Sequence, residues 1–329
     1  METITLPGIA LPASRIGLGT WAIGGWMWGG TDEAESIHTI HHALERGINL
    51  IDTAPVYGFG RSEEIVGKAL KAYGRRDEII LATKVGLRWD RGGITRDSSP
   101  QRLRQEVEDS LRRLQTDYID LYQVHWPDQS TPMEETAEAL ATLQQEGKIA
   151  AIGVSNFSPE QMTAFRGVAP LCSDQPPYNL FEREIEAAVL PYCREHGMAT
   201  LTYGALCRGL LSGKMTADRR FEGDDLRQSD PKFQPPRYAQ YLAAVEALSE
   251  HARTRYGKSV LAFAVRWLLD KPGVSVALWG ARHPGQLDVI PDIFGWSLDA
   301  EDYRIVDGLL DKHVVDPVGP EFMAPPEAA

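Results

Sequence analysis

Short apolar runs alternate with longer amphipathic stretches along most of this chain of 329 residues. The apolar runs are rich in Ile, Leu, Val and Ala, which is typical of buried strands. Strands are expected at residues 15–19, 49–52, 78–84, 119–125, 149–154, 171–175, 199–203 and 274–279. Because strands and helices alternate throughout, a parallel sheet with crossover helices is expected. Eight such units without a long inert linker favour an α/β fold with a single (β/α)8 TIM barrel over two domains.

Helix boundaries are marked by residues that favour helix starts and ends. A helix over residues 32–46 has Thr31 or Asp32 as its N-cap and Gly47 just beyond its end. Ser-Pro pairs open two further helices after Ser99 and Ser158, because serine caps the first turn and proline fits the next position. The first of these two is expected to run to residue 114. Further helices are expected at residues 62–73 and 133–145, each ended by a nearby glycine.

Three segments lie outside this repeating pattern. Residues 2–12 alternate and turn at Pro7-Gly8, which predicts a β-hairpin that caps the bottom of the barrel. The loop after the seventh strand, residues 207–238, is long and rich in Arg, Asp, Gly and Pro, and such loops are usually functional lids or clamps. Residues 1–315 therefore form the expected barrel domain, and residues 316–329 a Pro-rich tail. This tail is expected to be an extended surface arm, ordered only if Phe322 docks.

Reactive side chains stand at the ends of consecutive predicted strands. Asp52, Lys84 and His125 each close a strand, and Tyr57 follows Asp52 on a glycine-flanked loop. Such strand ends meet on one face of a parallel barrel, around one pocket. Taken singly, the aspartate could be a helix cap, the lysine a solvated rim residue and the histidine a structural one. Their joint placement favours a proton-transfer site.

The chemistry of these four groups fits carbonyl reduction. A free tyrosine has a pKa near 10 and is a poor acid at neutral pH. An ammonium group at Lys84 would stabilise the phenolate of Tyr57, and Asp52 would keep that ammonium charged and oriented. An imidazole at His125 can orient a carbonyl oxygen or relay a proton. The sequence therefore predicts a general acid at Tyr57 with three supporting groups.

Glycine-rich segments typical of phosphate binding occur after the second predicted strand and after the seventh and eighth, and only the later ones are interpreted as phosphate sites. Residues 58–63, GFGRSE, follow a strand and open a helix but lack the third glycine of a dinucleotide fingerprint, so the glycines are interpreted as turn residues. The loops after the seventh and eighth strands are better candidates, because barrels often bind phosphate there. Residues 203–214 hold a glycine-rich turn with two cations, and Gly280, Arg282 and Gln286 lie where a helix begins.

Aromatic and histidine side chains suggest a pocket but no metal site. Five tryptophans follow predicted strands, where they would wall a pocket: Trp21, Trp26, Trp28, Trp89 and Trp126. His38, His41 and His42 have metal-like helical spacing. However, their helix belongs to the outer ring, and no strand-end carboxylate joins them. No metal is expected.

Composition excludes several classes of protein. The net charge of −12 provides no basic face for nucleic acid. Three cysteines, Cys172, Cys193 and Cys207, are odd in number without CxxC spacing, which favours reduced thiols in a cytoplasmic protein. The N-terminus lacks the features of a secretory signal, and no apolar run reaches the roughly 18 residues of a membrane span.

Residues 3–315 resemble the aldo-keto reductase superfamily. The motifs that carry the resemblance occur in the family's order: Gly17-Leu-Gly-Thr-Trp21, Gly47-Ile-Asn-Leu-Ile-Asp-Thr-Ala54 with Tyr57, Thr83-Lys84, Asp120-Leu-Tyr-Gln-Val-His125, Gly153-Val-Ser-Asn-Phe157 and Gly209-Leu-Leu-Ser-Gly-Lys214. The segment Ala277-Leu-Trp-Gly-Ala-Arg282 and the tail Phe322-Met-Ala-Pro-Pro326 most resemble a bacterial group that includes general stress reductases and NADPH-dependent glycerol dehydrogenases.

The resemblance implies a barrel that binds NADPH or NADP+ across its C-terminal face, with Tyr57 as the general acid. It implies that Lys84 and Asp52 tune this tyrosine and that His125 orients the carbonyl. Around the nicotinamide it implies Ser155, Asn156 and Gln175 at the carboxamide, Tyr203 stacked on the ring, and Thr20 and Trp21 beside it.

The remaining cofactor contacts are also implied by the resemblance. The pyrophosphate would lie on the backbone of Gly204, Ala205, Leu206, Cys207 and Gly209, with Lys214 and Arg227 nearby. Arg282 would meet the 2′-phosphate, with Gly280 and Gln286 beside it, and a guanidinium suits phosphate, which favours NADPH over NADH. Two departures from the family pattern are the Gly204-Ala205 pair, where Ser-Pro is frequent, and the residues after Gln286. Adenine contacts beyond Gln286 are therefore not assigned.

The expected enzyme reduces small uncharged aldehydes or ketones to alcohols by reversible hydride transfer. Its substrate pocket is expected to comprise Trp21, Trp26, Tyr57, Trp89, His125 and Trp126. Two alternatives remain: a lyase that forms a Schiff base on Lys84, and an NADPH-binding redox-sensing subunit with slow turnover. The sequence leaves open whether the chain is a monomer or a homo-oligomer.

Overall fold

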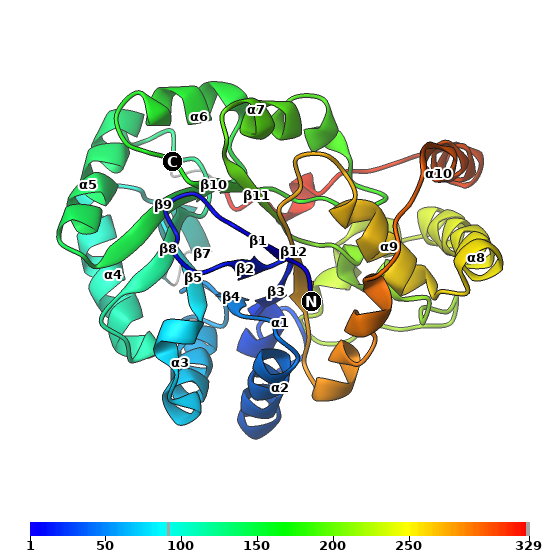
Figure 1. The fold of residues 1–329 in the computed structure, drawn as a ribbon, viewed down its shortest axis with the longest axis horizontal. Coiled ribbons are helices and arrows are strands. Elements are labelled where there is room, and N and C mark those ends of the chain that lie inside the picture. The colour runs from blue at the N-terminus through cyan, green and yellow to red at the C-terminus, as the bar shows by residue number, and fades with distance from the viewer. Residues whose placement is uncertain (91–92, 327–329) are drawn as a thin grey trace.

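Eight parallel strands close into a barrel within residues 1–90 and 93–326, which the computed structural model describes (Figure 1). They are β3 (Ile16–Gly19), β4 (Leu50–Asp52), β5 (Ile80–Val85), β8 (Ile119–Val124), β9 (Ile149–Ser155), β10 (Ser173–Gln175), β11 (Ala199–Thr202) and β12 (Val276–Gly280). Neighbours in the barrel follow chain order, and β12 pairs with β3 to close it. The predicted TIM barrel is confirmed. The third strand begins later than expected because Arg76–Glu78 form a 3-10 turn.

The helices surround the barrel as an outer ring (Figure 1). They are α1 (Trp21–Gly24), α2 (Glu33–Glu45), α3 (Arg61–Tyr73), α4 (Pro100–Leu114), α5 (Met133–Gln145), α6 (Pro159–Arg166), α7 (Val189–Glu195), α8 (Arg237–Tyr256), α9 (Val260–Leu269) and α10 (Ala300–His313). The expected caps are confirmed: Asp32, Ser99 and Ser158 each accept a hydrogen bond from a backbone N–H in the first turn. Gly74 ends α3 at a φ of 75°.

Period-two alternation along the strands divides their side chains between two apolar layers. One layer fills the barrel interior and includes Leu50, Ala82 and Leu121. The other faces the helices and includes Ile51 and Leu81. One pleat further along their strands, the inward positions become polar, at Asp52, Lys84, Gln123 and Gln175. The barrel therefore has an apolar lower half and a polar upper end.

A small hairpin closes the lower end of the barrel, as predicted. Strands β1 (Thr3–Ile4) and β2 (Ala13–Ser14) pair antiparallel. The loop between them turns at Gly8, with a φ of 75°. Leu6 and Ile9 on this loop are buried and join the interior apolar layer. In Figure 1 the hairpin lies across the barrel in dark blue.

A second hairpin was not predicted. Strands β6 (Leu87–Asp90) and β7 (Gly93–Arg96) pair antiparallel directly after β5, beside the polar end of the barrel. Its strands are short and mostly exposed or half-buried, so they lack the apolar run that reveals a buried strand.

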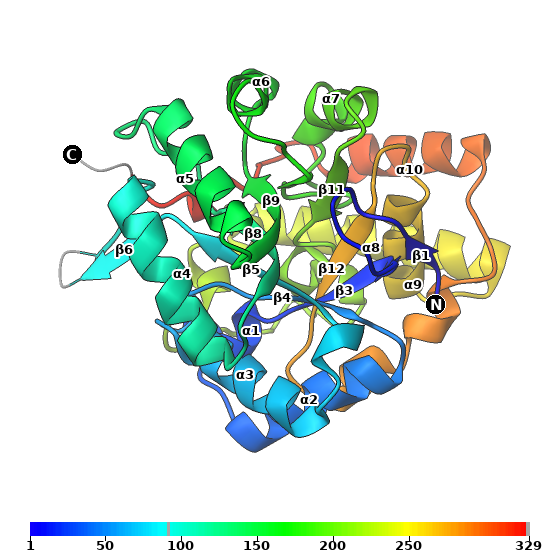
Figure 2. The ribbon, with the colours of Figure 1, turned by 60° about the vertical axis from the view of Figure 1, so that its left-hand side comes forward.

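The long connection and the tail both reach the polar end of the barrel. The connection contains 3-10 turns at Cys207–Ser212, Leu226–Gln228 and Pro231–Phe233. The tail runs from α10 towards the β6–β7 hairpin, where Arg96 donates hydrogen bonds to the carbonyl of Pro325 (Figure 2). Phe322 is docked, which was the condition for an ordered tail; residues 327–329 lie outside the described part of the chain. Among the described helices, none is long and apolar enough to cross a membrane.

Asp174 on β10 is a buried carboxyl group in the layer that faces the helices. Within the described part of the chain neither of its oxygens accepts a hydrogen bond of normal geometry, although the N–H groups of Phe157 and Gln175 favour the charged form. Burial outweighs this help and raises the pKa of Asp174 to about 8. In the unfolded chain the carboxyl ionises near its ordinary pKa of about 4. Between these two values unfolding releases a proton, so stability falls as the pH rises.

Asp174→Asn is therefore expected to stabilise the protein increasingly as the pH rises. Its gain over wild type should grow from about pH 5 to about pH 8, by at most ~1.4 kcal/mol per pH unit. Urea unfolding at several pH values measures it. Asp311→Asn, on the exposed face of α10, is the matched control and should show no such trend. A gain from Asp174→Asn that is the same at every pH would contradict the account.

Candidate active site

The ends of β4 and β5 bring Asp52 and Lys84 together, with Tyr57 above them. The ammonium of Lys84 lies 2.6 Å from Oδ1 of Asp52 and 3.2 Å from the hydroxyl oxygen of Tyr57. It also donates to the carbonyl of Thr53, at 3.1 Å. Because Lys84 donates to the tyrosine oxygen, the hydroxyl hydrogen of Tyr57 is free to point into the cavity.

The second carboxylate oxygen of Asp52 is held by two glutamines from other strands of the barrel, Gln123 on β8 and Gln175 on β10. Oδ2 accepts hydrogen bonds from Nε2 of Gln175 at 2.8 Å and from Nε2 of Gln123 at 3.2 Å. A buried ion pair is stable only when further hydrogen bonds satisfy its remaining lone pairs and protons. The two glutamines and the Thr53 carbonyl supply these bonds for Asp52 and Lys84.

Close backbone packing fixes the position of Tyr57. A Cβ on Gly24 would lie 2.7 Å from the backbone of Tyr57, and one on Gly58 would lie 2.2 Å from the Gly24 carbonyl. Only glycine therefore fits at this contact between α1 and the tyrosine loop, and Gly58 also has a φ of 66°. The Trp21 ring stacks on the Tyr57 ring, with centroids 5.8 Å apart. The loop glycines thus serve the turn at Tyr57, as the sequence suggested.

Burial dominates the electrostatics of the tyrosine and the lysine. Burial, with the negative charge of Asp52 second, raises the pKa of Tyr57 well above its ordinary value. Burial lowers the pKa of Lys84, and Asp52 opposes that effect. The sequence predicts that the ammonium of Lys84 lowers the pKa of Tyr57, but burial has the larger effect. Tyr57 is instead a protonated phenol throughout the neutral range, which is the form that a proton donor needs.

His125 lies edge-on to the tyrosine ring, with ring centroids 5.8 Å apart and an interplanar angle of 80°. Burial and then the charge of Lys84 lower the pKa of His125 well below its ordinary value. The imidazole is therefore neutral at pH 7. A neutral ring beside the Tyr57 hydroxyl can exchange one hydrogen bond with a substrate oxygen without competing as the acid.

A cavity of about 1120 Å³ extends from this site across the upper end of the barrel. Such a volume exceeds the usual range of a pocket for one drug-sized molecule. The proposed cofactor residues that line it are Thr20, Trp21, Asp52, Ser155, Asn156, Gln175, Tyr203, Gly204, Ala205, Leu206, Gly209, Lys214, Arg227, Gly280, Arg282 and Gln286. Cys207 and Lys84 are buried behind its wall.

The cavity wall suits an elongated anion with aromatic parts. The indole N–H groups of Trp21 and Trp28 are buried without a hydrogen-bond partner among the described residues. The turn over residues 204–209 has left-handed φ values at Gly204, Cys207, Arg208 and Gly209. Two of these four are not glycine, and such strain is usually retained where function requires it. The cations Lys214, Arg219 and Arg227 also line the cavity. These residues fit a nicotinamide dinucleotide.

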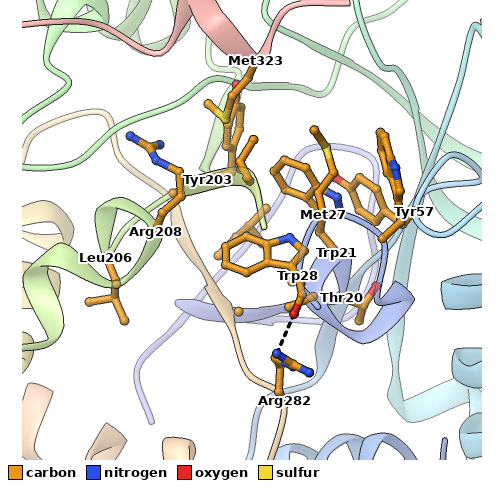
Figure 3. A pocket seen from close by; sticks show the side chains of 18 of the residues that line it. Thr20, Trp21, Met27, Trp28, Tyr57, Tyr203, Leu206, Arg208, Arg282 and Met323 are labelled. Atoms are coloured by element: carbon orange, nitrogen blue, oxygen red, sulfur yellow. Dashed lines mark hydrogen bonds between the residues drawn. The ribbon is translucent and has the colours of Figure 1, made fainter. Parts of the chain in front are cut away.

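The loop over residues 27–30, which contributes Met27 and Trp28 to the cavity wall, is held by two other segments of the chain. Asp224, on the long connection, accepts hydrogen bonds from the backbone N–H groups of Met27 at 2.7 Å and Gly29 at 3.3 Å. From the other side, the guanidinium of Arg282 donates to the carbonyl of Trp28 at 2.7 Å and that of Gly30 at 2.9 Å (Figure 3). Arg282, which the resemblance assigns to a phosphate, is thus occupied by main-chain oxygens in this state.

The residues assigned to the carboxamide are linked by hydrogen bonds. Tyr203 donates to Oδ1 of Asn156 at 2.9 Å, and Nδ2 of Asn156 donates to Oγ of Ser155 at 3.0 Å. Ser155 donates in turn to the carbonyl of Gln175, at 2.7 Å. The side-chain amide nitrogen of Gln175 donates to Asp52 at 2.8 Å and to Oε1 of Gln123 at 3.3 Å, so its side-chain oxygen is the atom available to a ligand.

Aromatic side chains wall the tyrosine end of the cavity. Trp21, Trp26, Trp28 and Trp126 line it, as expected for a substrate pocket. Trp89 lines instead an adjoining smaller cavity of about 480 Å³, with Trp26 and Phe59. Trp89 is on β6, in the hairpin that was not predicted, so its neighbours could not be inferred.

Two contributors to the site were missed from the sequence. Gln123 holds Asp52 and could have been found, because it lies two residues before His125 and therefore on the same inward face. Asp224 lies in the long connection, where no periodic pattern indicates which side chain reaches the loop over residues 27–30. His38, His41 and His42 form no metal-binding group, and among the described residues no cluster of potential ligands is found elsewhere.

Comparison with known proteins gives consistent matches. The family described as "Aldo/keto reductase family" matches residues 15–311. The aldo-keto reductase YhdN of Bacillus subtilis is 62% identical over 326 residues, which cover 99% of this chain and 98% of that protein. The NADH-specific methylglyoxal reductase of Escherichia coli is 37% identical over 302 residues, covering 87% and 91%.

Solved structures agree with these matches. The glycerol dehydrogenase AKR11B4 from Gluconobacter oxydans superposes with a TM-score of 0.89 at 58% identity, covering 98% of this chain and 99% of that one. The aldo-keto reductase AKR11C1 from Bacillus halodurans superposes with a TM-score of 0.78 at 32% identity, covering 94% and 96%.

Proposed function

Because this chain belongs to the aldo/keto reductase family, we propose that it reduces small uncharged aldehydes and ketones to alcohols with NADPH, reversibly. One observation carries the proposal. The Tyr57 hydroxyl, held at 3.2 Å by Lys84, faces the same continuous cavity that reaches Arg282. A proton donor and a site for a large anionic ligand therefore share one space.

Bound NADPH would supply the hydride, and the chain supplies the proton. The carbonyl oxygen would lie between the Tyr57 hydroxyl and the neutral His125 ring. As negative charge develops on that oxygen, the tyrosine proton moves to it, and the ammonium of Lys84 stabilises the resulting phenolate. In the oxidative direction the same phenolate takes the proton back from the alcohol.

Lys84 supports the tyrosine rather than acting as a nucleophile. Its ammonium has three partners, Asp52, Thr53 and Tyr57, and Lys84 is absent from the residues that line the cavity. A Schiff base needs a free amine in contact with substrate. The geometry thus favours reductase over lyase chemistry.

The choice of NADPH rests on Arg282. The Escherichia coli relative is described as NADH-specific, so membership of the family does not decide the choice. Arg282 lines the same cavity as Tyr57, and its guanidinium donates to the main-chain carbonyls of Trp28 and Gly30. A bidentate guanidinium matches a phosphate better than it matches two separate carbonyl groups. We therefore assign it to the 2′-phosphate.

Arg282→Met is expected to raise the KM for NADPH by about 10- to 100-fold, because charge-assisted hydrogen bonds to the phosphate are lost. The KM for NADH, which lacks that phosphate, should change little. Steady-state kinetics with both cofactors measures the two values. Lys214→Met is the matched control: a cation near the pyrophosphate should weaken both cofactors alike. If Arg282→Met raised the KM for NADPH and for NADH equally, the role of this arginine would instead be to hold the loop at Trp28.

A substrate panel tests the reaction itself. The aromatic wall of the cavity suits uncharged carbonyl compounds, and two relatives are described as a methylglyoxal reductase and a glycerol dehydrogenase. Short aldehydes, dicarbonyls and glyceraldehyde-like compounds should be reduced with NADPH, and charged keto acids poorly. If only a charged keto acid turned over, the substrate assignment would be wrong.

A further inference from the structure

A buried cluster of four charged side chains lies behind the turn over residues 204–209. Arg208 donates to both oxygens of Glu182, and its Nε lies 2.6 Å from Oδ2 of Asp230. Lys232 lies 2.8 Å from Oε1 of Glu182. All four side chains are at most 4% exposed. Two cations and two anions balance, so the cluster is neutral only when complete. It is called the ionic cluster below.

The ionic cluster is joined directly to the proposed pyrophosphate turn. Arg208 belongs to that turn, lines the cavity and has a left-handed φ of 53°. Asn179 donates from one amide nitrogen to Glu182 at 2.7 Å and to the carbonyl of Gly204 at 3.0 Å. Both ends of the turn are therefore held by the cluster. These side-chain bonds add to the backbone hydrogen bonds within the turn, such as that from Cys207 to the carbonyl of Gly204 at 2.7 Å.

The same ionic cluster holds the C-terminal tail. Nζ of Lys232 donates to the carbonyl of Gly319 at 2.8 Å. The ring of Phe322 lies 5.5 Å from the guanidinium carbon of Arg208 and 5.9 Å from Nζ of Lys232. Lys232 is fully buried and is not among the residues that line the cavity. It can therefore affect a bound cofactor only through its neighbours.

We propose that the ionic cluster couples docking of the C-terminal tail to cofactor affinity, with Lys232 as the positioning residue for the pyrophosphate turn and Phe322, which also lines the cavity, as the tail residue docked on the cluster. This inference rests on the proposed function, since it requires that the cavity bind NADPH. With the tail docked, Lys232 and the Phe322 ring fix Arg208, and Arg208 fixes the turn. When the contact with Lys232 is lost, Glu182 and Asp230 share the single positive charge of Arg208, and the turn no longer keeps the conformation that suits an anion.

The coupling is reciprocal, as linkage requires. If tail docking strengthens cofactor binding, cofactor binding must strengthen tail docking by the same factor. The backbone amides of residues 319–324 should therefore exchange with solvent more slowly when NADPH is bound. This readout needs no catalysis.

A second anchor of the tail provides an internal comparison. Arg96 donates to the carbonyl of Pro325 at 3.0 and 3.2 Å and to that of Pro127 at 2.9 Å. These bonds hold the end of the tail beside the β6–β7 hairpin, at the substrate mouth. They have no direct link to Glu182 or Asp230. The two anchors should thus affect different ligands.

Lys232→Met tests the inference by removing the charge at similar length. The Kd for NADPH, measured by titrating protein fluorescence, should rise about 10-fold, within the usual range of coupling between sites. At saturating NADPH and carbonyl, kcat should stay within about twofold, because the tyrosine site is untouched. The slowing of exchange at residues 319–324 by NADPH should disappear. Should this buried variant fail to fold, Phe322→Ala, at a half-buried position, is expected to raise the Kd about 5-fold.

Three companion variants decide the interpretation. Asp316→Asn removes an exposed tail contact with Arg237 and should leave the Kd unchanged. Arg96→Met should raise the KM for the carbonyl but not the Kd for NADPH. The double variant Lys232→Met with Phe322→Ala should lose less affinity than the product of the two single losses, because both act through Arg208.

The binding measurements distinguish failure of the proposed function from failure of the coupling. If wild type does not bind NADPH at all, the proposed function fails. If wild type binds NADPH but Lys232→Met and Phe322→Ala keep the wild-type Kd, only the coupling is wrong. An Arg96→Met or Asp316→Asn variant that weakens NADPH as much as Lys232→Met would also overturn it, because tail contacts in general would then matter rather than the ionic cluster.

Discussion

Tyr57→Phe is expected to lower kcat for carbonyl reduction at least ~100-fold while NADPH binding changes little, since general acid catalysis contributes about that much or more. The substitution removes one oxygen from a ring that remains stacked on Trp21. Lys84 retains Asp52 and the Thr53 carbonyl as partners, so no buried charge is left alone. The loss should therefore appear in the chemical step. Single-turnover reduction with bound NADPH measures that step directly.

Tyr73→Phe, on α3 and away from the cavity, is the matched control and should keep the wild-type rate. If Tyr57→Phe kept more than about a tenth of the rate, another group would be the acid. His125 would then be the first candidate, because its ring lies edge-on to the tyrosine ring.

Lys84→Met should lower kcat by at least ~100-fold and also destabilise the fold, two effects with separate causes. The rate falls because no cation remains to stabilise the Tyr57 phenolate. Stability falls by about 3–5 kcal/mol, because removing one partner leaves Asp52 buried without its counter-charge. Chemical unfolding and single-turnover kinetics measure the two losses independently.

The double variant Lys84→Met with Asp52→Asn separates the two causes. Replacing both members of a buried pair is often nearly neutral, so much of the lost stability should return. The rate should not return, because the cation is still absent. A double variant that recovered both stability and rate would show that Lys84 has a structural role only.

The barrel could be predicted from the sequence because its strands and helices obey simple periodicities. Strand β8 is buried along its whole length, and the helix caps at Asp32, Ser99 and Ser158 are local signals. The convergence of Asp52, Lys84 and His125 followed from topology, since residues at strand ends must meet at one end of a parallel barrel. Both inferences need only short stretches of chain.

The parts that could not be predicted depend on contacts between distant segments. Glu182, Arg208 and Lys232 meet although none is within 20 residues of another. Arg282 donates to carbonyls of residues 28 and 30, a contact that depends on the conformation of a glycine-rich loop. The β6–β7 hairpin is short and largely exposed, so its pattern resembles that of an ordinary loop. Such contacts produce no periodic pattern in the local sequence.

We propose that the hydride of NADPH and the proton of Tyr57 reach the same carbonyl group within one cavity. The most direct test is to reduce a small aldehyde with NADPH deuterated at the reactive position of the nicotinamide, and to analyse the alcohol by mass spectrometry. One deuterium is expected to be transferred to the carbinol carbon without loss to solvent, and Tyr57→Phe is expected to slow this transfer severely. An alcohol without deuterium, or transfer that proceeds at the wild-type rate in Tyr57→Phe, would contradict the proposal.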